Sequence, residues 1–235
     1  MLRLAALMPL ALVACVDSGD EGIFVVTNTA VTGGTCSLTG EPSQPQIGHG
    51  TINASSPISY VMTPLIKSKI LPVEGVDPTQ KTVQLRGADV SLTLKAVTIN
   101  NNGSFTSTNP NTALGAPFSV LFSGALGPGA SVNSFVDIIP PQQLIAIGAM
   151  AGTGSINAEV LAEVVIKGDL NGDEIKSQPF FYPVTVCNDC VVNIVGACPV
   201  MGTIRGGNAC NPFQDGVVDC CTETSGAVSC PARAM

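Results

Sequence analysis

The cysteines constrain this chain more than any other feature of its sequence. Cys15 lies near the N-terminus, and seven of the other eight cysteines gather after residue 186. An even number of cysteines in an exported chain predicts a disulfide framework, here of four bridges, whose pairing stays open. Cys220 and Cys221 need different partners because a bridge between neighbours is strained. We expect Cys36 to tie the start of the domain to the C-terminal cluster. The eight cysteines of the framework are Cys36, Cys187, Cys190, Cys198, Cys210, Cys220, Cys221 and Cys230.

A short apolar segment at the N-terminus is typical of an export signal. The single positive charge of Arg3 precedes the apolar run LAALMPLALVA. This run is shorter than the about 20 residues that cross a bilayer as a helix, but it has the length of a signal-peptide core. We therefore expect residues 1–14 to be a signal peptide and residues 15–22 to be a flexible tether. No later segment reaches about 18 apolar residues in a row, so we expect no transmembrane helix.

The residues Leu12-Val13-Ala14-Cys15 resemble a bacterial lipobox. In lipoproteins the cysteine of this motif receives a diacylglyceryl group and the peptide is cleaved before it. The resemblance thus implies that Cys15 is lipidated, and two or three acyl chains hold a protein stably at a membrane. Val16 after the cysteine resembles the pattern for transport to the outer membrane. The alternative is an ordinary signal peptide that ends in a small residue.

Residues 23–186 have the pattern of an all-β domain. Charged residues make up 11% of the chain, and the sequence lacks the long periodicity of helical bundles and coiled coils. Apolar and polar residues alternate from Leu92 to Ala96, as expected for a strand with one buried face. Turn residues separate strands that we predict at 23–31, 58–62, 81–85, 89–99, 117–123, 131–139, 156–166 and 174–186.

These strands predict an immunoglobulin-like β-sandwich, with a jelly roll as the alternative. One helix is predicted at 142–150, because prolines precede it and glycines follow it. Residues 40–57 are rich in Gly, Pro and Ser, and we interpret them as an irregular loop. Residues 187–235 form a cysteine-rich extension that we expect disulfides to stabilise, since it is too small to bury a core unaided.

Two segments of the C-terminal half carry a second resemblance. They are FFYPVTVCNDC at 180–190 and CNPFQDGVVDCC at 210–221. Together with the lipobox they resemble surface lipoproteins of soil-dwelling deltaproteobacteria that combine a sandwich with a cysteine-rich tail. The resemblance implies an anchored surface protein and brings no known activity with it.

One acidic segment resembles the start of a calcium loop. Asp169, Asn171 and Asp173 place oxygen ligands at alternate positions, as calcium sites do. The pattern departs from an EF-hand because Glu174 occupies the sixth position, where glycine is expected, and Phe180 occupies the twelfth. The Asn-Gly dipeptide inside the segment instead favours a solvated hairpin turn.

Other candidates for chemistry are isolated. Cys187 and Cys190 have the spacing of a redox pair or half a zinc site, but the sequence shows no βαβ unit and no second ligand pair at zinc spacing, so structural disulfides are favoured. His49, the one histidine, lies between two glycines, and an exposed loop imidazole is the plainer interpretation. The acid pairs Asp215 with Asp219 and Glu159 with Glu163 share a spacing that a glycosidase could use.

The sequence favours an anchored binding protein over an enzyme. A net charge of -7 argues against nucleic acid as a partner. The absence of Trp and the presence of two Tyr argue against carbohydrate stacking. We expect a non-enzymatic binding, adhesion or envelope-structural module on the outer membrane or cell surface, with no cofactor. Its partners would be the membrane, through the lipid, and an envelope protein or extracellular ligand. The alternative is a hydrolase whose carboxylates meet only in the fold.

Overall fold

The computed structural model of the chain describes residues 22–31, 36–38, 43–72, 74–75, 78–188, 190–200 and 202–231. The strands are β1 (Ile23–Asn28), β2 (Gly50–Asn53), β3 (Tyr60–Met62), β4 (Pro64–Ser68), β5 (Val83–Asn101), β6 (Ser104–Thr108), β7 (Thr112–Ala113), β8 (Phe118–Leu126), β9 (Ser131–Asn133), β10 (Val136–Ile139), β11 (Ser155–Leu170), β12 (Asp173–Lys176), β13 (Phe180–Cys187), β14 (Val192–Ala197), β15 (Val218–Thr222) and β16 (Val228–Ser229). The helices are η1 (Pro78–Lys81), a 3-10 turn, and α1 (Pro141–Ala149). The all-β prediction is confirmed.

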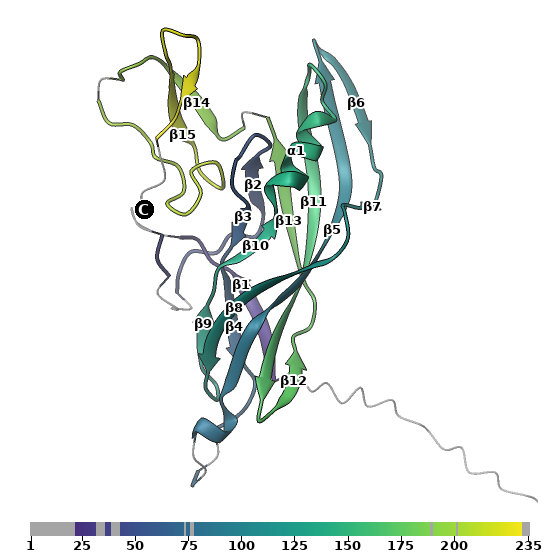
Figure 1. The fold of residues 1–235 in the computed structure, drawn as a ribbon, viewed down its shortest axis with the longest axis vertical. Helices are drawn as coiled ribbons and strands as arrows, with labels where there is room; N and C mark the ends of the chain where they lie inside the picture. The colour runs from purple at the N-terminus through teal and green to yellow at the C-terminus, as the bar shows by residue number, and fades with distance from the viewer. Residues whose placement is uncertain are drawn as a thin grey trace, which may run out of the picture.

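Two long strands form the axis of the molecule (Figure 1). β5 and β11 pair antiparallel over almost their whole length, from Ser155 opposite Asn100 to Asp169 opposite Gln84. β13 and then β2 continue the sheet beyond β11, while β8, β7 and β6 pair in turn with the other side of β5. β12 folds back on the end of β11 as a hairpin. The long axis thus comes from one pair of strands rather than from many short ones.

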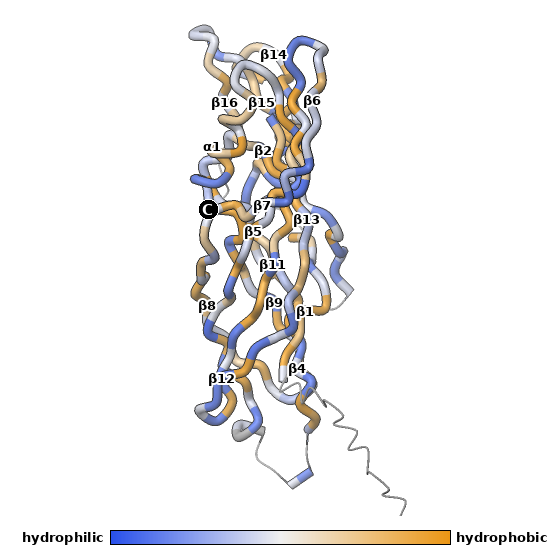
Figure 2. Tube along the Cα trace, turned by 90° about the vertical axis from the view of Figure 1, so that its right-hand side faces the viewer, coloured by the Kyte–Doolittle hydropathy of each residue, from blue (hydrophilic) through white to orange (hydrophobic). Residues whose placement is uncertain are grey.

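A second layer covers one face of this sheet. It consists of the sheet β1-β4-β9 and the pair β10-β3. The core between the layers contains every second side chain of β11, which explains the alternating hydropathy of the strand (Figure 2). These residues are Ile156, Ala158, Val160, Ala162, Val164 and Ile166. The arrangement is a β-sandwich, and its immunoglobulin-like topology stays a prediction.

Several predicted boundaries were wrong because local turn signals do not always end a strand. The strands predicted at 81–85 and 89–99 are one strand, β5, whose register shifts near Gly87. Gly87 has a φ of 150°, so the glycine marks a β-bulge and not a turn. Conversely, the strand predicted at 174–186 is two strands, β12 and β13. The strand predicted at 131–139 is also two, β9 and β10, which belong to different sheets.

The loop predicted at 40–57 contains a strand that the sequence did not indicate. β2 pairs parallel with β13 at the edge of the large sheet. β4, β6 and the three strands of the extension were likewise not predicted. The helix prediction is confirmed, since α1 begins at Pro141, whose missing N–H is not needed in the first turn.

The C-terminal extension forms a small sheet in the order β14-β15-β16. It lies alongside the end of the sandwich (Figure 1). Two disulfides stabilise it internally, Cys198–Cys221 and Cys220–Cys230, so the adjacent cysteines have different partners as predicted. Cys36–Cys210 ties the start of the domain to the extension, also as predicted. Cys187–Cys190 closes the end of β13. Within the described residues, no helix is long and apolar enough to cross a membrane.

Candidate functional site

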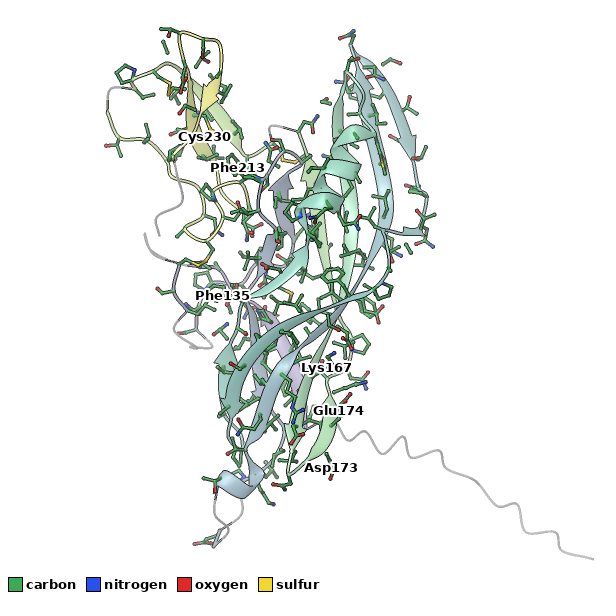
Figure 3. All side chains as sticks on the ribbon, in the orientation of Figure 1. Phe135, Lys167, Asp173, Glu174, Phe213 and Cys230 are labelled. Atoms are coloured by element: carbon green, nitrogen blue, oxygen red, sulfur yellow. A yellow bond between two sulfur atoms is a disulfide. The ribbon has the colours of Figure 1, made fainter. Side chains whose placement is uncertain are left out.

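Residues 211–215, here called the edge segment, join the extension to the sandwich. The Asn53 amide donates to the Phe213 carbonyl at 2.9 Å, and the Asp215 amide donates to the Thr51 carbonyl at 2.8 Å. The Thr51 amide in turn donates to Oδ1 of Asp215 at 2.8 Å. Phe213 is labelled at this junction in Figure 3. The edge segment therefore occupies the edge of the large sheet beside β2.

A side chain of the edge segment pairs with the second layer. The Val61 amide donates to Oε1 of Gln214 at 2.8 Å, and Nε2 of Gln214 donates to the Val61 carbonyl at 2.9 Å. Nδ2 of Asn211 donates to the Ser59 carbonyl at 2.9 Å. Backbone groups shielded from water need hydrogen-bond partners. The Gln214 side-chain amide supplies these partners to Val61, as the backbone of a neighbouring strand would. The edge segment thereby connects the edges of β2 and β3.

A cluster of two buried tyrosines and one partly buried carboxylate lies beneath this junction. The Tyr60 hydroxyl donates to Oδ2 of Asp215 at 2.7 Å and lies 3.0 Å from the Tyr182 hydroxyl. Burial raises the pKa of Asp215, although hydrogen bonds from Tyr60, the Thr51 amide and Gln214 oppose the shift. Burial also raises the pKa of Tyr182 to about 12 and that of Tyr60 well above its usual value. The phenols stay protonated, and the Asp215 oxygens are used to fasten the edge segment.

His49 takes part in a polar row across the outer face of the large sheet. Thr185 on β13 lies opposite Glu159 on β11, and its hydroxyl donates to Oε1 of Glu159 at 2.6 Å. Nε2 of His49 lies 2.6 Å from the same hydroxyl and 3.6 Å from Glu159. Since the one hydroxyl proton of Thr185 goes to Glu159, the hydroxyl accepts its bond from His49. The row is therefore a surface network, and His49 does not activate Thr185 as a nucleophile.

A hollow of about 500 Å³ lies beyond this row, towards the end of the sheet. The hairpin of β5 and β6 contributes one wall, and the Cys187–Cys190 bridge contributes another. Five of the nine lining residues carry an amide or a hydroxyl group, and none of the described lining side chains carries a charge. The lining residues are Thr98, Asn100, Phe105, Ser155, Ile156, Asn157, Cys187, Asn188 and Cys190.

The segment that resembles a calcium loop forms a tight hairpin turn. Asn171 and Gly172 have φ values of 56° and 96°, which a two-residue turn of this kind requires. Asp169 accepts one bond from Nη2 of Arg86 at 2.8 Å and another from the Gly172 amide at 2.8 Å. Asp173 lies at the tip of the hairpin, far from the extension (Figure 3). No group of three or more acidic, histidine or cysteine side chains suited to a metal ion occurs among the residues that the structure describes.

The acid pairs do not form a common site. Asp215 fastens the edge segment, whereas Asp219 accepts hydrogen bonds from Arg205 and Asn193 inside the extension. The Arg205 guanidinium lowers the pKa of Asp219. Glu159 and Glu163 share the outer face of β11, as their spacing predicts, but they have different partners. Glu163 accepts a bond of 3.5 Å from Ser91.

Sequence reasoning missed the residues that form the edge junction and the hollow. Tyr60 and Gln214 meet their partners across more than 120 positions of the chain, so no local pattern marks them. Phe105 did leave a signal, because it is a lone aromatic residue in the polar run Ser104–Thr108. Cys15 and the signal segment lie outside the described residues. No family model matches this chain, and no curated protein matches it.

Proposed function

We propose that this chain is an exported, lipid-anchored binding module of the bacterial envelope. The observation that carries the proposal is the set of four disulfides, which are typical of a periplasmic or extracellular environment. The lipobox resemblance at Cys15 supports a lipid anchor. The tether at 15–22 would then separate the sandwich from the membrane surface.

A binding role fits the polar groups of the described residues better than a hydrolytic one. The Asp215 carboxylate has the raised pKa of many catalytic acids, but it accepts bonds from Tyr60, Thr51 and Gln214, and no second carboxylate is among its hydrogen-bond partners in the described chain. The outer face of the large sheet instead presents a hollow whose described lining residues carry no charge. Concave sites that combine apolar surface with a few polar groups are typical of ligand binding.

The intact mass of the protein extracted from membranes tests the anchor. We expect a species that begins at Cys15, is heavier by its acyl chains and gains about 8 Da when the four bridges are reduced. The variant Cys15→Ser loses the acyl mass and leaves the membrane fraction. Ser18→Ala, a change in the same tether, keeps both. A wild-type protein without acyl mass, or one with free thiols before reduction, contradicts the proposal.

A further inference from the structure

The hollow beside the Cys187–Cys190 bridge lies at a defined place on the outer face of the large sheet. Asn157 of β11 forms its floor, in register with Thr98 on β5 and with Cys187 on β13. Phe105 of β6 and Asn188 lie around the floor and complete the lining. A volume of about 500 Å³ falls within the range of sites for small organic ligands.

The polar side chains of the hollow are of two kinds. Asn100 and Thr98 are fixed, because Asn100 accepts a bond from the Gly103 amide at 2.9 Å and the Thr98 hydroxyl lies 3.0 Å from that of Ser107. The side chains of Ser155, Asn157 and Asn188, in contrast, form no hydrogen bond to any residue that the structure describes. These three side chains therefore present amide and hydroxyl groups that can both donate and accept hydrogen bonds.

The chemistry of the lining selects the charge of the ligand. Among the lining residues that the structure describes, none is ionisable apart from the bridged cysteines, so these residues offer an ionic ligand no counter-charge. The nearest charged side chain along β11 is Glu159, whose carboxylate already accepts the Thr185 hydroxyl. The described lining therefore favours a neutral ligand that exchanges hydrogen bonds and also has an apolar face.

The aromatic residue of the lining adds an apolar face. Phe105 is 69% exposed on β6, although burial of a phenyl ring is strongly favourable. A sugar ring offers hydroxyls at its edge and C–H groups on its face, which match an array of amides beside one phenyl ring. We infer that this hollow binds a neutral saccharide, with Phe105 against the ring face and Asn157, Asn188 and Ser155 hydrogen-bonded to the hydroxyls.

This inference depends on the proposed binding function and revises one expectation from composition. The two tyrosines are buried in the core and cannot stack on a ligand. Phe105 supplies an aromatic face that counting Trp and Tyr overlooks. The bridge between Cys187 and Cys190 has a structural role here, since it fixes one wall of the hollow.

Titration of the isotope-labelled protein with defined sugars tests the inference. The probes are neutral tetrasaccharides of glucose and of N-acetylglucosamine, with a tetrasaccharide of galacturonic acid as the charged comparison. We expect at least one neutral probe to shift the side-chain amide signals of Asn157 and Asn188, while the charged probe leaves them unchanged. Phe105→Ala and Asn157→Ala each weaken binding by about tenfold or more. Phe181→Ala, which removes an exposed ring of the same sheet outside the hollow, keeps the wild-type affinity.

The outcomes separate this inference from the proposed function. A protein with the acyl mass whose hollow signals respond to none of the neutral probes at about 10 mM overturns the saccharide assignment alone. Equal affinity for the charged probe, or unchanged affinity in Phe105→Ala, overturns it as well. Saccharide binding by a protein without the acyl mass supports the inference and contradicts the anchor instead.

Discussion

Asp215 shows how one partly buried carboxyl group can hold a segment in place. An ionised carboxylate in the interior costs free energy unless donors surround it, and three donors do so here, from Tyr60, Thr51 and Gln214. Burial still dominates, so the pKa of Asp215 is raised. The folded protein therefore binds the Asp215 proton more tightly than the unfolded chain. The contribution of protonated Asp215 to the stability of the fold is present below the ordinary carboxyl pKa. This contribution is lost as the pH rises through the raised pKa of Asp215 in the folded protein.

The variant Asp215→Asn should remove this pH dependence. The amide oxygen of asparagine keeps the acceptor for the Thr51 amide but cannot ionise. We expect the melting temperature of the variant to change less than that of the wild type between about pH 4 and pH 7. Thermal unfolding at several pH values measures this, and Glu163→Gln on the outer face is the control. Identical slopes for Asp215→Asn and the wild type would refute the role assigned to burial.

Arg205 and Arg86 form ion pairs of different environment. Asp219 is 8% exposed and accepts bonds from Nε and Nη2 of Arg205 and from the Arg205 amide. Asp169 is 17% exposed and accepts one bond from Arg86, and single-bonded pairs with an exposed arginine contribute little. We expect Arg205→Met to speed hydrogen exchange in β15, while Arg86→Met leaves β11 and β12 unchanged. Equal effects would show that the additional bonds from Arg205 do not matter.

Because the Arg205 guanidinium lowers the pKa of Asp219, the effect of Arg205→Met also has a pH dependence. The contribution of the pair is present above the ordinary carboxyl pKa and is lost as the pH falls through the lowered value. The difference between Arg205→Met and the wild type should therefore shrink in acid. A difference that grows in acid would contradict this sign.

At the scale of elements, the β-bulge of β5 depends on one glycine. A Cβ at Gly87 would lie 2.2 Å from the Val120 carbonyl oxygen, and the φ of 150° already disfavours a side chain. We expect Gly87→Ala to lower the free energy of unfolding by about 2–3 kcal/mol. Gly103→Ala is the control, because Gly103 also has a positive φ but open space around it, and it should cost about 1 kcal/mol. Chemical denaturation measures the free energy of unfolding of both variants. Equal losses would show that the contact between the added Cβ and the Val120 oxygen does not destabilise the fold.

The elements also show where sequence patterns succeed. Alternation predicted the central part of β5, and proline before a short apolar run predicted α1, because each signal acts within a few residues. β2 was missed because its stability comes from β13 and from Asp215, which lies 164 positions from Thr51. The hollow was missed for the same reason, since its lining comes from the hairpin of β5 and β6 and from β11 and β13, which are distant from that hairpin in sequence.

At the scale of the molecule, the extension is connected to both layers of the sandwich through the edge segment. The edge segment supplies partners to backbone groups of both layers, at Thr51 on β2 and at Val61 on β3. Cys210 immediately precedes the edge segment and is bridged to Cys36, 174 positions earlier in the chain. This disulfide therefore closes a loop that contains most of the sandwich and fixes the edge segment at its place.

Removal of this bridge should cost far more than removal of Cys187–Cys190. In the chain-entropy account the stabilisation by a disulfide rises with the logarithm of the loop length, so a loop of this length contributes about 5 kcal/mol and a four-residue loop about 2 kcal/mol. We expect the double variant of Cys36 and Cys210 to alanine to unfold at a lower denaturant concentration than the alanine variant of Cys187 and Cys190. Hydrogen exchange should also accelerate at the amides of Thr51 and Val61 in the first variant only, because these amides donate to the edge segment. Unchanged protection of both amides would mean that the edge segment stays in place without its covalent link.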